Sequence, residues 1–240
     1  LNNTTGGFLA PTTIATGAAP VSLWRDDLNR DGNLDLYVGS GNGLYVHLGN
    51  GNGTFASPII VDSGVSTIGL DSGDYSGDGI PDLVVMTSGG NSITIKLGNG
   101  NGTFTNGQTL LAGTNPTVVI HQDFNGDNKS DLAVSNDGGV MLFLGSGNGT
   151  FIAPGISIAV APNGLSVEGD DFNQDGKMDL MVTSGASASP NANTVAVLLN
   201  TTPSLPSGTV TFGAPTFYAV GIDPRGGTSD MNDDGISDIV

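Results

Sequence analysis

One short motif recurs along the chain and constrains its fold more than any other feature. The string Asp-x-Asn-x-Asp-Gly-x-x-Asp, or a close variant of it, starts at Asp27, Asp74, Asp123, Asp171 and Asp230. Successive starts are 47, 49, 48 and 59 residues apart. Self-similarity at such a period is typical of repeat architectures, in which each repeat supplies one supersecondary unit. The sequence therefore predicts five repeats of about 48 residues.

A second element follows the acidic motif at constant phase. It reads LGNGNGTF at Leu48–Phe55 and at Leu97–Phe104, and LGSGNGTF at Leu144–Phe151. Three residues after the phenylalanine stands a proline, namely Pro58, Pro154, Pro215 and Pro11, whereas the second repeat has Gly107 at this place. Two elements in register make a chance resemblance between the repeats implausible.

Short apolar runs separated by Gly and Asn clusters fill the remainder of each repeat. Leu83-Val84-Val85-Met86 follows one acidic motif, and Ile93-Thr94-Ile95-Lys96-Leu97 comes after the next turn. Runs of this length without a helical period indicate strands joined by tight turns. Each repeat supplies about four strands, which predicts an all-β protein, a β-propeller of four-stranded blades. The alternative, an ordinary β-sandwich, does not account for the period.

We expect residues 1–240 to form a single β-propeller domain, with blades centred on the motif copies 27–35, 74–82, 123–131, 171–179 and 230–238. Leu1 aligns with Leu97 and Val240 aligns with Val84, so residues 1–15 are expected to complete the last blade. Counterparts of residues 85–96 are then missing. Either the chain is an excerpt of a longer repeat array, or a neighbouring molecule supplies the strand by β-augmentation.

The acidic residues are concentrated in the motif. The net charge is -17 although only 12% of residues are charged, and 15 aspartates stand at positions 1, 5 and 9 of the five copies. Aspartates concentrated in this way, without Lys or Arg residues to balance their charge, indicate cations as partners. Six Lys and Arg residues are too few for nucleic-acid binding or for attraction to an anionic membrane. No apolar run is long enough for membrane insertion, and the absence of cysteine excludes disulfides and zinc-thiolate sites.

The chemistry of the motif favours calcium. In the first copy, Asp27, Asn29, Asp31 and Asp35 offer side-chain oxygens at positions 1, 3, 5 and 9, and Asn33 offers a backbone carbonyl at position 7. Gly32 permits the loop to curl, as in the EF-hand loop, although here strands are expected to flank it. A ligand set of hard oxygens selects calcium over zinc or copper, and magnesium resists such full dehydration.

The other four copies repeat this pattern with small changes. Their candidate ligands are Asp74, Ser76, Asp78, Ile80 and Asp82; Asp123, Asn125, Asp127, Lys129 and Asp131; Asp171, Asn173, Asp175, Lys177 and Asp179; and Asp230, Asn232, Asp234, Ile236 and Asp238. Ser76 is a shorter ligand than asparagine, and Asn128 replaces the glycine at position 6, so these two sites are expected to bind more weakly. Asparagine also visits the left-handed region, so the third loop is expected to survive.

An alternative for the motif is a set of Asx-turns without any ion. Five copies with three spaced aspartates each would then crowd like charges without a counterion. We therefore predict up to five calcium ions, which would neutralise more than half of the net charge of -17 and contribute to folding.

The two repeated elements resemble those of the FG-GAP and VCBS repeats found in integrin α-subunit propellers and in many bacterial surface and secreted proteins. The resemblance covers nearly the whole chain. It implies a calcium-binding propeller located outside the cell or at the cell surface, with a protein or a glycan of a cell surface or matrix as partner. Family propellers often have seven blades, whereas this chain holds five repeats.

Little other chemistry can be found in the sequence. His47 and His121 are the only histidines; His47 is expected to face solvent, and His121 lies just before the third motif. No Ser-His-Asp or paired-carboxylate arrangement emerges above the aspartate background, which favours a non-enzymatic protein. Trp24 has no tryptophan counterpart in the other repeats, so the sequence does not support a lectin with one aromatic platform per blade.

The leading hypothesis is thus a calcium-rigidified adhesion or structural module. The alternatives are a carbohydrate-binding lectin and a surface or filament protein that self-associates through its incomplete blade.

Overall fold

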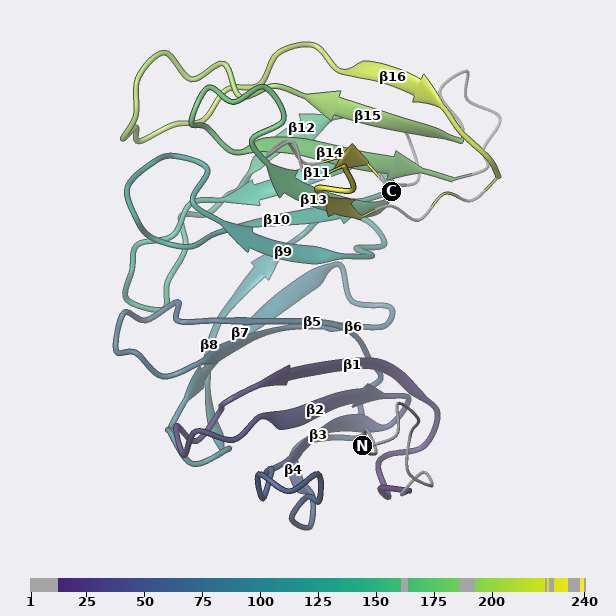
Figure 1. Ribbon diagram of the computed structural model, residues 1–240, viewed down its shortest axis with the longest axis vertical. Coiled ribbons are helices and arrows are strands. Elements are labelled where there is room, and N and C mark those ends of the chain that lie inside the picture. Colours follow the sequence, from purple (N-terminus) through teal and green to yellow (C-terminus); the bar gives the residue numbers. More distant parts are fainter. Residues whose placement is uncertain are drawn as a thin grey trace.

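The chain folds into antiparallel β-sheets arranged one after another (Figure 1). The computed structural model describes residues 13–160, 164–185, 193–222, 224, 227–232 and 238–239. Over these residues it contains four four-stranded sheets, one two-stranded pair and no helix. Accordingly, this part of the chain offers no helix with the length and apolarity needed to cross a membrane.

Each of the four sheets is one sequence repeat, with its strands paired in sequence order. The first contains β1 (Pro20–Asp26), β2 (Asp35–Ser40), β3 (Gly43–His47) and β4 (Ile59–Ser63). The second contains β5 (Thr67–Gly73), β6 (Asp82–Thr87), β7 (Ser92–Gly98) and β8 (Phe104–Leu111). The third contains β9 (Val119–Gln122), β10 (Asp131–Asn136), β11 (Gly139–Phe143) and β12 (Ile156–Ala159). The fourth contains β13 (Gly164–Asp170), β14 (Asp179–Ser184), β15 (Thr194–Leu198) and β16 (Thr216–Ala219).

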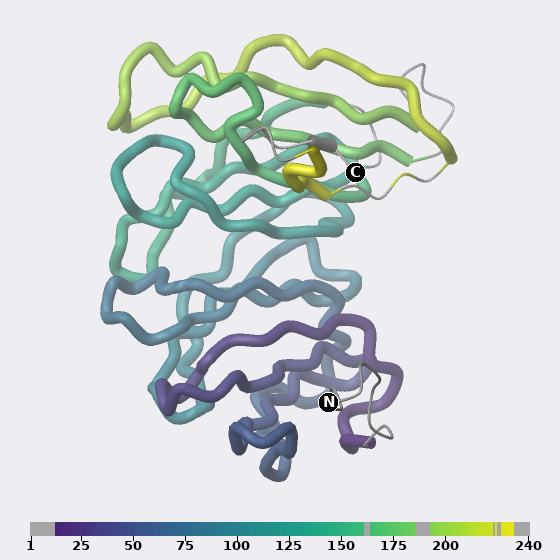
Figure 2. Tube along the Cα trace, in the orientation of Figure 1, coloured from purple at the N-terminus to yellow at the C-terminus, as the bar shows by residue number. Residues whose placement is uncertain are grey.

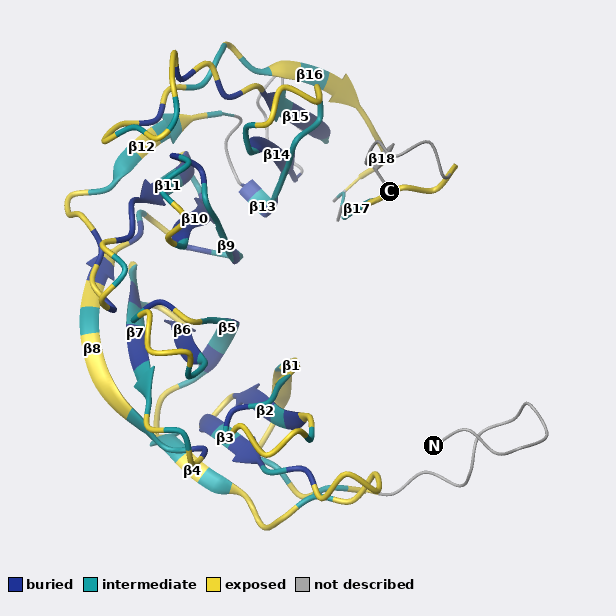
Figure 3. Cartoon of the chain, turned by 60° about the vertical axis from the view of Figure 1, so that its left-hand side comes forward, coloured by how far each residue is buried: buried dark blue, intermediate teal, exposed yellow. Residues whose placement is uncertain are grey.

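The four sheets stand side by side along an arc, like the blades of a propeller (Figure 3). Strands β1, β5, β9 and β13 lie along its inner side, and the fourth strand of each sheet lies along the outer side. The chain passes from one sheet directly to the next, as the colour gradient in Figure 2 shows. Among the described residues the sheets form an open arc rather than a closed ring.

The hydrophobic core lies between successive sheets. Tyr37, Leu44 and Val46 of the first sheet form one cluster with Leu83 and Val85 of the second. The opposite face of the second sheet presents residues such as Val84, Met86 and Ile93 to the third. Since side chains alternate along a strand, a strand with covered faces on both sides must be apolar throughout. This explains why residues 83–86 of β6 are an uninterrupted apolar run rather than an alternating one.

The structure confirms an all-β, propeller-like architecture with four strands per repeat for the first four repeats. Of the fifth repeat it describes only the short pair β17 (Thr228–Ser229) and β18 (Asp238–Ile239). Residues 1–12 lie outside the described residues. The expectation that residues 1–15 complete the last blade therefore stays a prediction.

Candidate functional site

The acidic motifs form the turns between the first and second strands of the sheets. Residues 27–35 connect β1 to β2, and the next three copies connect β5 to β6, β9 to β10 and β13 to β14. Because the sheets repeat, each loop stands at the same end of its own sheet. Strands flank all four loops, as the sequence predicts.

The carboxylate at position 1 organises the curl of each loop. In the first copy, Asp27 accepts hydrogen bonds from the backbone N–H groups of Asp31 at 3.0 Å and Gly32 at 2.9 Å. Asn29 Oδ1 accepts a further bond from Asp31 N–H at 3.0 Å, and Asp31 Oδ1 accepts one from Asn33 N–H at 2.8 Å. This last bond is the main cause that lowers the pKa of Asp31. The bonds hold the side chains of positions 1, 3 and 5 inside the turn.

The same bonds recur in the next three copies. Asp74, Asp123 and Asp171 each accept from the backbone N–H groups of positions 5 and 6. Asn125 and Asn173 accept from position 5 in the manner of Asn29. In the second loop, Ser76 takes the place of the asparagine, and its backbone N–H donates to Asp82 at 2.9 Å. This is one of the two loops for which we predict weaker binding.

Two residues of each loop adopt left-handed backbone conformations. At position 6, φ is +86° for Gly32, +79° for Gly79, +60° for Asn128 and +81° for Gly176. The left-handed conformation of Asn128 confirms that asparagine can replace glycine at this place. Position 4 is left-handed too, with positive φ at Arg30, Gly77, Gly126 and Gln174. Sequence reasoning missed this second requirement, because Arg30 and Gln174 carry no signal for it.

The aspartate at position 9 is buried and ties the loop to the neighbouring turn. Asp35, Asp82, Asp131 and Asp179 are all 0% exposed. In the third sheet, Asp131 Oδ2 accepts from Phe124 N–H at 3.0 Å and Oδ1 accepts from Gly145 N–H at 2.8 Å. Gly145 belongs to the second sequence element, LGSGNGTF at Leu144–Phe151. Asp35 and Asp82 accept from Gly49 and Gly98 at the same place of their repeats. In the first three sheets, therefore, this carboxylate joins the acidic motif to the second element, which accounts for their constant phase.

Burial raises the pKa of these four carboxyl groups. The pKa of Asp131 is raised to about 7, mainly by burial and in smaller part by repulsion from the neighbouring carboxylates of Asp127 and Asp123. Asp31 and Asp27 act in the same way on the pKa of Asp35. Within each of these two loops, then, the carboxylates at positions 1 and 5 are near enough to disfavour the charge of the carboxylate at position 9. A cation among them would reverse this effect.

The carboxylates do not meet at a single point. Within the described part of the chain, no three His, Cys, Asp or Glu side chains gather as a group that could hold a metal ion. The further oxygens that a cation could use in each loop are those of the amide or hydroxyl at position 3 and of the backbone carbonyls. Of the fifth copy, Asp230 and Asn232 are exposed and Asp238 lies in β18, whereas Asp234 and Ile236 lie outside the described residues.

The two histidines occupy different surroundings from those expected. His47, at the end of the third strand, is only 1% exposed and not solvent-facing, although it lies on the face of the first sheet that no other described sheet covers. Burial lowers its pKa and favours the neutral ring. His121 Nδ1 lies 2.7 Å from Asp71 Oδ2, so it pairs with a carboxylate of the second sheet rather than with the third loop.

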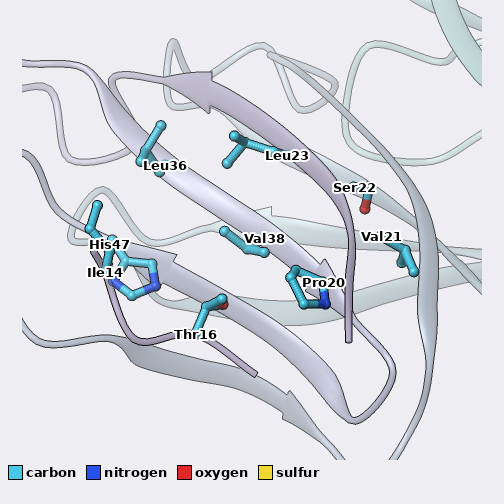
Figure 4. Close-up of a pocket in the computed structure, with 9 residues that line it drawn as sticks. All are labelled: Ile14, Thr16, Pro20, Val21, Ser22, Leu23, Leu36, Val38 and His47. Carbon is cyan, nitrogen blue, oxygen red and sulfur yellow. The ribbon is translucent and has the colours of Figure 1, made fainter. Parts of the chain in front are cut away.

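His47 lines a pocket of about 380 Å³ together with Leu23, Leu36 and Val38 (Figure 4). These four residues stand at the repeat positions of Leu70, Leu83, Val85 and Lys96, which in the second sheet face the first. The pocket is therefore the face by which a blade packs on its predecessor. At this end of the arc, the face remains partly open, and Leu23 is 63% exposed.

Comparison with known families identifies the repeat. Residues 27–85 and 123–182 match the FG-GAP-like repeat family. The chain contains FG-GAP-like repeats. Each match begins at position 1 of an acidic loop and ends within the second strand of the following repeat. The family resemblance inferred from the two sequence elements is thereby confirmed. No curated protein matches the chain.

Several solved structures are similar to this chain. One is an Agrocybe aegerita lectin described as recognising non-reducing terminal N-acetylglucosamine, with a TM-score of 0.54 and 20% identity over 80% of this chain and 50% of the lectin chain. A second is the Photorhabdus luminescens Tc holotoxin pore, with a TM-score of 0.49 and 17% identity over 96% of this chain and 11% of that chain. A third is the V. cholerae biofilm matrix protein Bap1, with a TM-score of 0.42 and 19% identity over 76% of this chain and 35% of that chain. The chain thus spans half or less of each of these three structures. At 20% identity, the likeness to the lectin shows the fold alone.

Proposed function

We propose that this chain is a non-enzymatic, calcium-rigidified β-propeller module that binds a protein or glycan partner at a cell surface or in a matrix. The observation that carries the proposal is the shared geometry of the four described acidic loops. In each, the carboxylate at position 1 accepts from positions 5 and 6, while that at position 9 is buried beside it. The carboxylates at positions 5 and 9 also bond to backbone N–H groups, but a cation among the three would offset the repulsion that raises the pKa of Asp35 and Asp131.

The donor chemistry of the loops fits calcium. Every candidate side-chain ligand is a carboxylate, amide or hydroxyl oxygen, which hard cations prefer. Repulsion from the other two carboxylates raises the pKa of Asp35 and Asp131, and a divalent ion would convert this repulsion into attraction. In this proposal, the ion is bound by positions 1, 3, 5 and 9 and by the carbonyl of position 7. It stabilises the hairpin between the first and second strands.

Thermal unfolding with excess calcium and with a chelator tests the metal proposal. Ligand binding to the folded state stabilises it by about 2.7 kcal/mol per site at a hundredfold excess over Kd, so four or five sites would raise Tm markedly. Magnesium at the same concentration should have a smaller effect. Mass spectrometry on the folded protein would count the ions. An identical Tm in calcium and in chelator would overturn the proposal.

A matched pair of variants makes the test specific. Asp171→Asn removes a position-1 charge of the fourth loop, whereas Asp137→Asn removes an exposed carboxylate outside the loops that bonds to Asn115. The first change should reduce the calcium-induced rise in Tm and lower the number of bound ions by one. The second should leave both unchanged. Equal responses would show that the calcium effect depends on overall charge rather than on the loops.

A carbohydrate partner is the second candidate. The fold likeness to the Agrocybe aegerita lectin supports it, and a polar pocket between the first two sheets supplies a specific location, described below.

Self-association is the third candidate. It is supported by the partly open face of the first sheet, at which Leu23 and Val21 are 63% and 58% exposed. Light scattering over a range of concentrations tests the third candidate, since a monomer at all concentrations would exclude it.

A further inference from the structure

A small polar pocket lies between the outer strands of the first and second sheets. Its volume is about 280 Å³, and its polar lining comes from Asp62 on β4, Thr87 on β6, Thr94 and Lys96 on β7, and Asn106 and Thr109 on β8. Val65 and Val85 supply apolar walls. The pocket is separate from the acidic loops, since none of these residues belongs to a motif copy.

Lys96 is the centre of the pocket. It is only 5% exposed, and its Nζ lies 2.7 Å from Asp62 Oδ1 and 2.7 Å from Asn106 Oδ1. The Asp62 side chain is 23% exposed, so the carboxylate retains access to solvent. Withdrawing an ammonium group from water is costly, and a buried ion pair is often no more stable than an apolar pair of similar size. Compared with an apolar pair, the ion pair therefore does not add to the stability of the fold at this point.

The other sheets show that packing does not require this ion pair. In the third and fourth sheets, the repeat position of Lys96 is occupied by Phe143 and Leu198 respectively. In the second and third sheets, the repeat position of Asp62 is occupied by Leu110 and Ile158 respectively. Leu110 belongs to the same core cluster as Phe143, and Ile158 to the same cluster as Leu198. Apolar pairs thus fill the equivalent place at both other sheet interfaces.

The strand that closes the pocket also departs from the repeat. Strands β4, β12 and β16 begin only after the prolines at 58, 154 and 215, since proline has no N–H to donate to the ladder. Gly107 stands at that place in the second repeat, and β8 runs unbroken over eight residues. As a result Asn106 pairs with Lys96 across β7 and β8, beside a bulge between Thr94 and Lys96. Bulges are frequent next to functional sites because they re-aim side chains.

Three departures from the repeat thus meet in one pocket: Lys96, Asp62 and Gly107. Its ion pair is neutral overall, and the net charge of -17 opposes an anionic ligand. The ammonium, the carboxylate, the amide and three hydroxyls can donate to and accept from several hydroxyl groups. The volume lies just below the range of roughly 300–1,000 Å³ usual for drug-sized ligands, which suits a smaller molecule.

We infer that this pocket binds a neutral monosaccharide unit, such as the terminal residue of a glycan. Lys96 and Asn106 donate to its hydroxyls, the carboxylate of Asp62 accepts from them, and Thr94 and Thr109 bond to the more exposed side. This inference deepens the proposed binding function by naming the ligand class and the site. It does not depend on the acidic loops, so it fails or succeeds separately from the calcium proposal.

Saturation-transfer NMR on the full chain in calcium, with galactose, glucose, mannose, fucose and N-acetylglucosamine as probes, tests the inference. At least one of these sugars should bind. Thr109→Val should weaken that binding up to about tenfold, because it removes one hydrogen bond from the pocket. Thr105→Val on the same strand, outside the pocket, is the matched control and should bind as the unmodified chain does. If none of the five sugars binds, the inference is wrong.

A double variant keeps the test independent of folding. Asp62→Leu with Lys96→Phe reproduces the pair Leu110 and Phe143, which the structure already accommodates at the next interface. It should retain the unfolding temperature in calcium and lose sugar binding entirely. Sugar binding that persists in the double variant would place the site elsewhere and overturn the assignment. If Tm is the same in calcium and in chelator while sugar binds, only the calcium proposal fails.

Discussion

Removal of the Asp131 side chain tests whether position 9 anchors the fold rather than serving only as a metal ligand. Asp131 is fully buried, and its two oxygens accept the backbone N–H groups of Phe124 and Gly145. Asp131→Ala leaves both N–H groups buried without an acceptor. Each unsatisfied buried group costs about 1–3 kcal/mol, so we expect a loss of roughly 2–6 kcal/mol in the free energy of unfolding. That is a large part of the ~5–15 kcal/mol typical of a domain.

Two further variants calibrate this loss. Asp137→Ala removes the same charge from the same sheet, but its carboxylate bonds only to the exposed Asn115 side chain, so we expect a change within about 0.5 kcal/mol. Asp131→Asn keeps one acceptor oxygen and places an amide against the other N–H group. It should therefore give an intermediate loss.

The assay is urea unfolding followed by circular dichroism, once with saturating calcium and once with chelator. If position 9 anchors the two turns, the difference between Asp131→Ala and Asp137→Ala should persist in chelator. If the carboxylate matters only through a bound ion, that difference should vanish when calcium is removed. Equal stabilities of the two variants in chelator would therefore refute the anchoring role.

Two further predictions follow from local geometry and charge. Gly32→Ala should lower the free energy of unfolding by about 1–2 kcal/mol, because φ is +86° at this residue. A steric clash does not contribute, since an added Cβ would meet no atom within 4 Å. Gly208→Ala is the control in the same urea titration, because Gly208 has equally open surroundings and no positive φ. The hydrogen bond between His121 and the Asp71 carboxylate raises the pKa of His121 in the folded state, so its stabilising contribution is complete below the unfolded pKa of about 6.5 and is lost as pH rises through the raised value. The stability difference between the unmodified chain and His121→Gln should accordingly shrink as pH rises above about 6.5, and a difference independent of pH would contradict this reasoning.

Much of the loop could be predicted from the sequence because local rules govern it. The oxygen-bearing residues at positions 1, 3 and 5 bond to backbone groups within a few residues, so their spacing already encodes the turn. Asn128 could be accepted at position 6 for the same reason, since its left-handed preference is intrinsic to the residue. The left-handed backbone of Arg30 at position 4 could not be foreseen, because the surrounding bonds impose it against the residue's own preference.

His47 shows why burial was harder to predict. Its alternation with Tyr45 suggests an outward-facing residue on a two-faced strand, which holds for a sheet with one side in solvent. His47 is nevertheless 1% exposed, and it shares its pocket with Ile14 and Thr16 of the segment that precedes the first strand (Figure 4). The repeat makes this visible only when His47 is compared with Lys96, Phe143 and Leu198 at the same position.

The sequence by itself determined the repeat, the four strands of each unit and the chemistry of the acidic loops, because these depend on spacing within about 48 residues. Tertiary structure decided which faces of the sheets meet and that Asp131 joins its loop to the turn at Gly145. It also decided that Lys96 reaches Asp62 across two sheets. Contacts between residues of different strands and sheets depend on register and packing, and the spacing of residues along the chain does not encode either one directly.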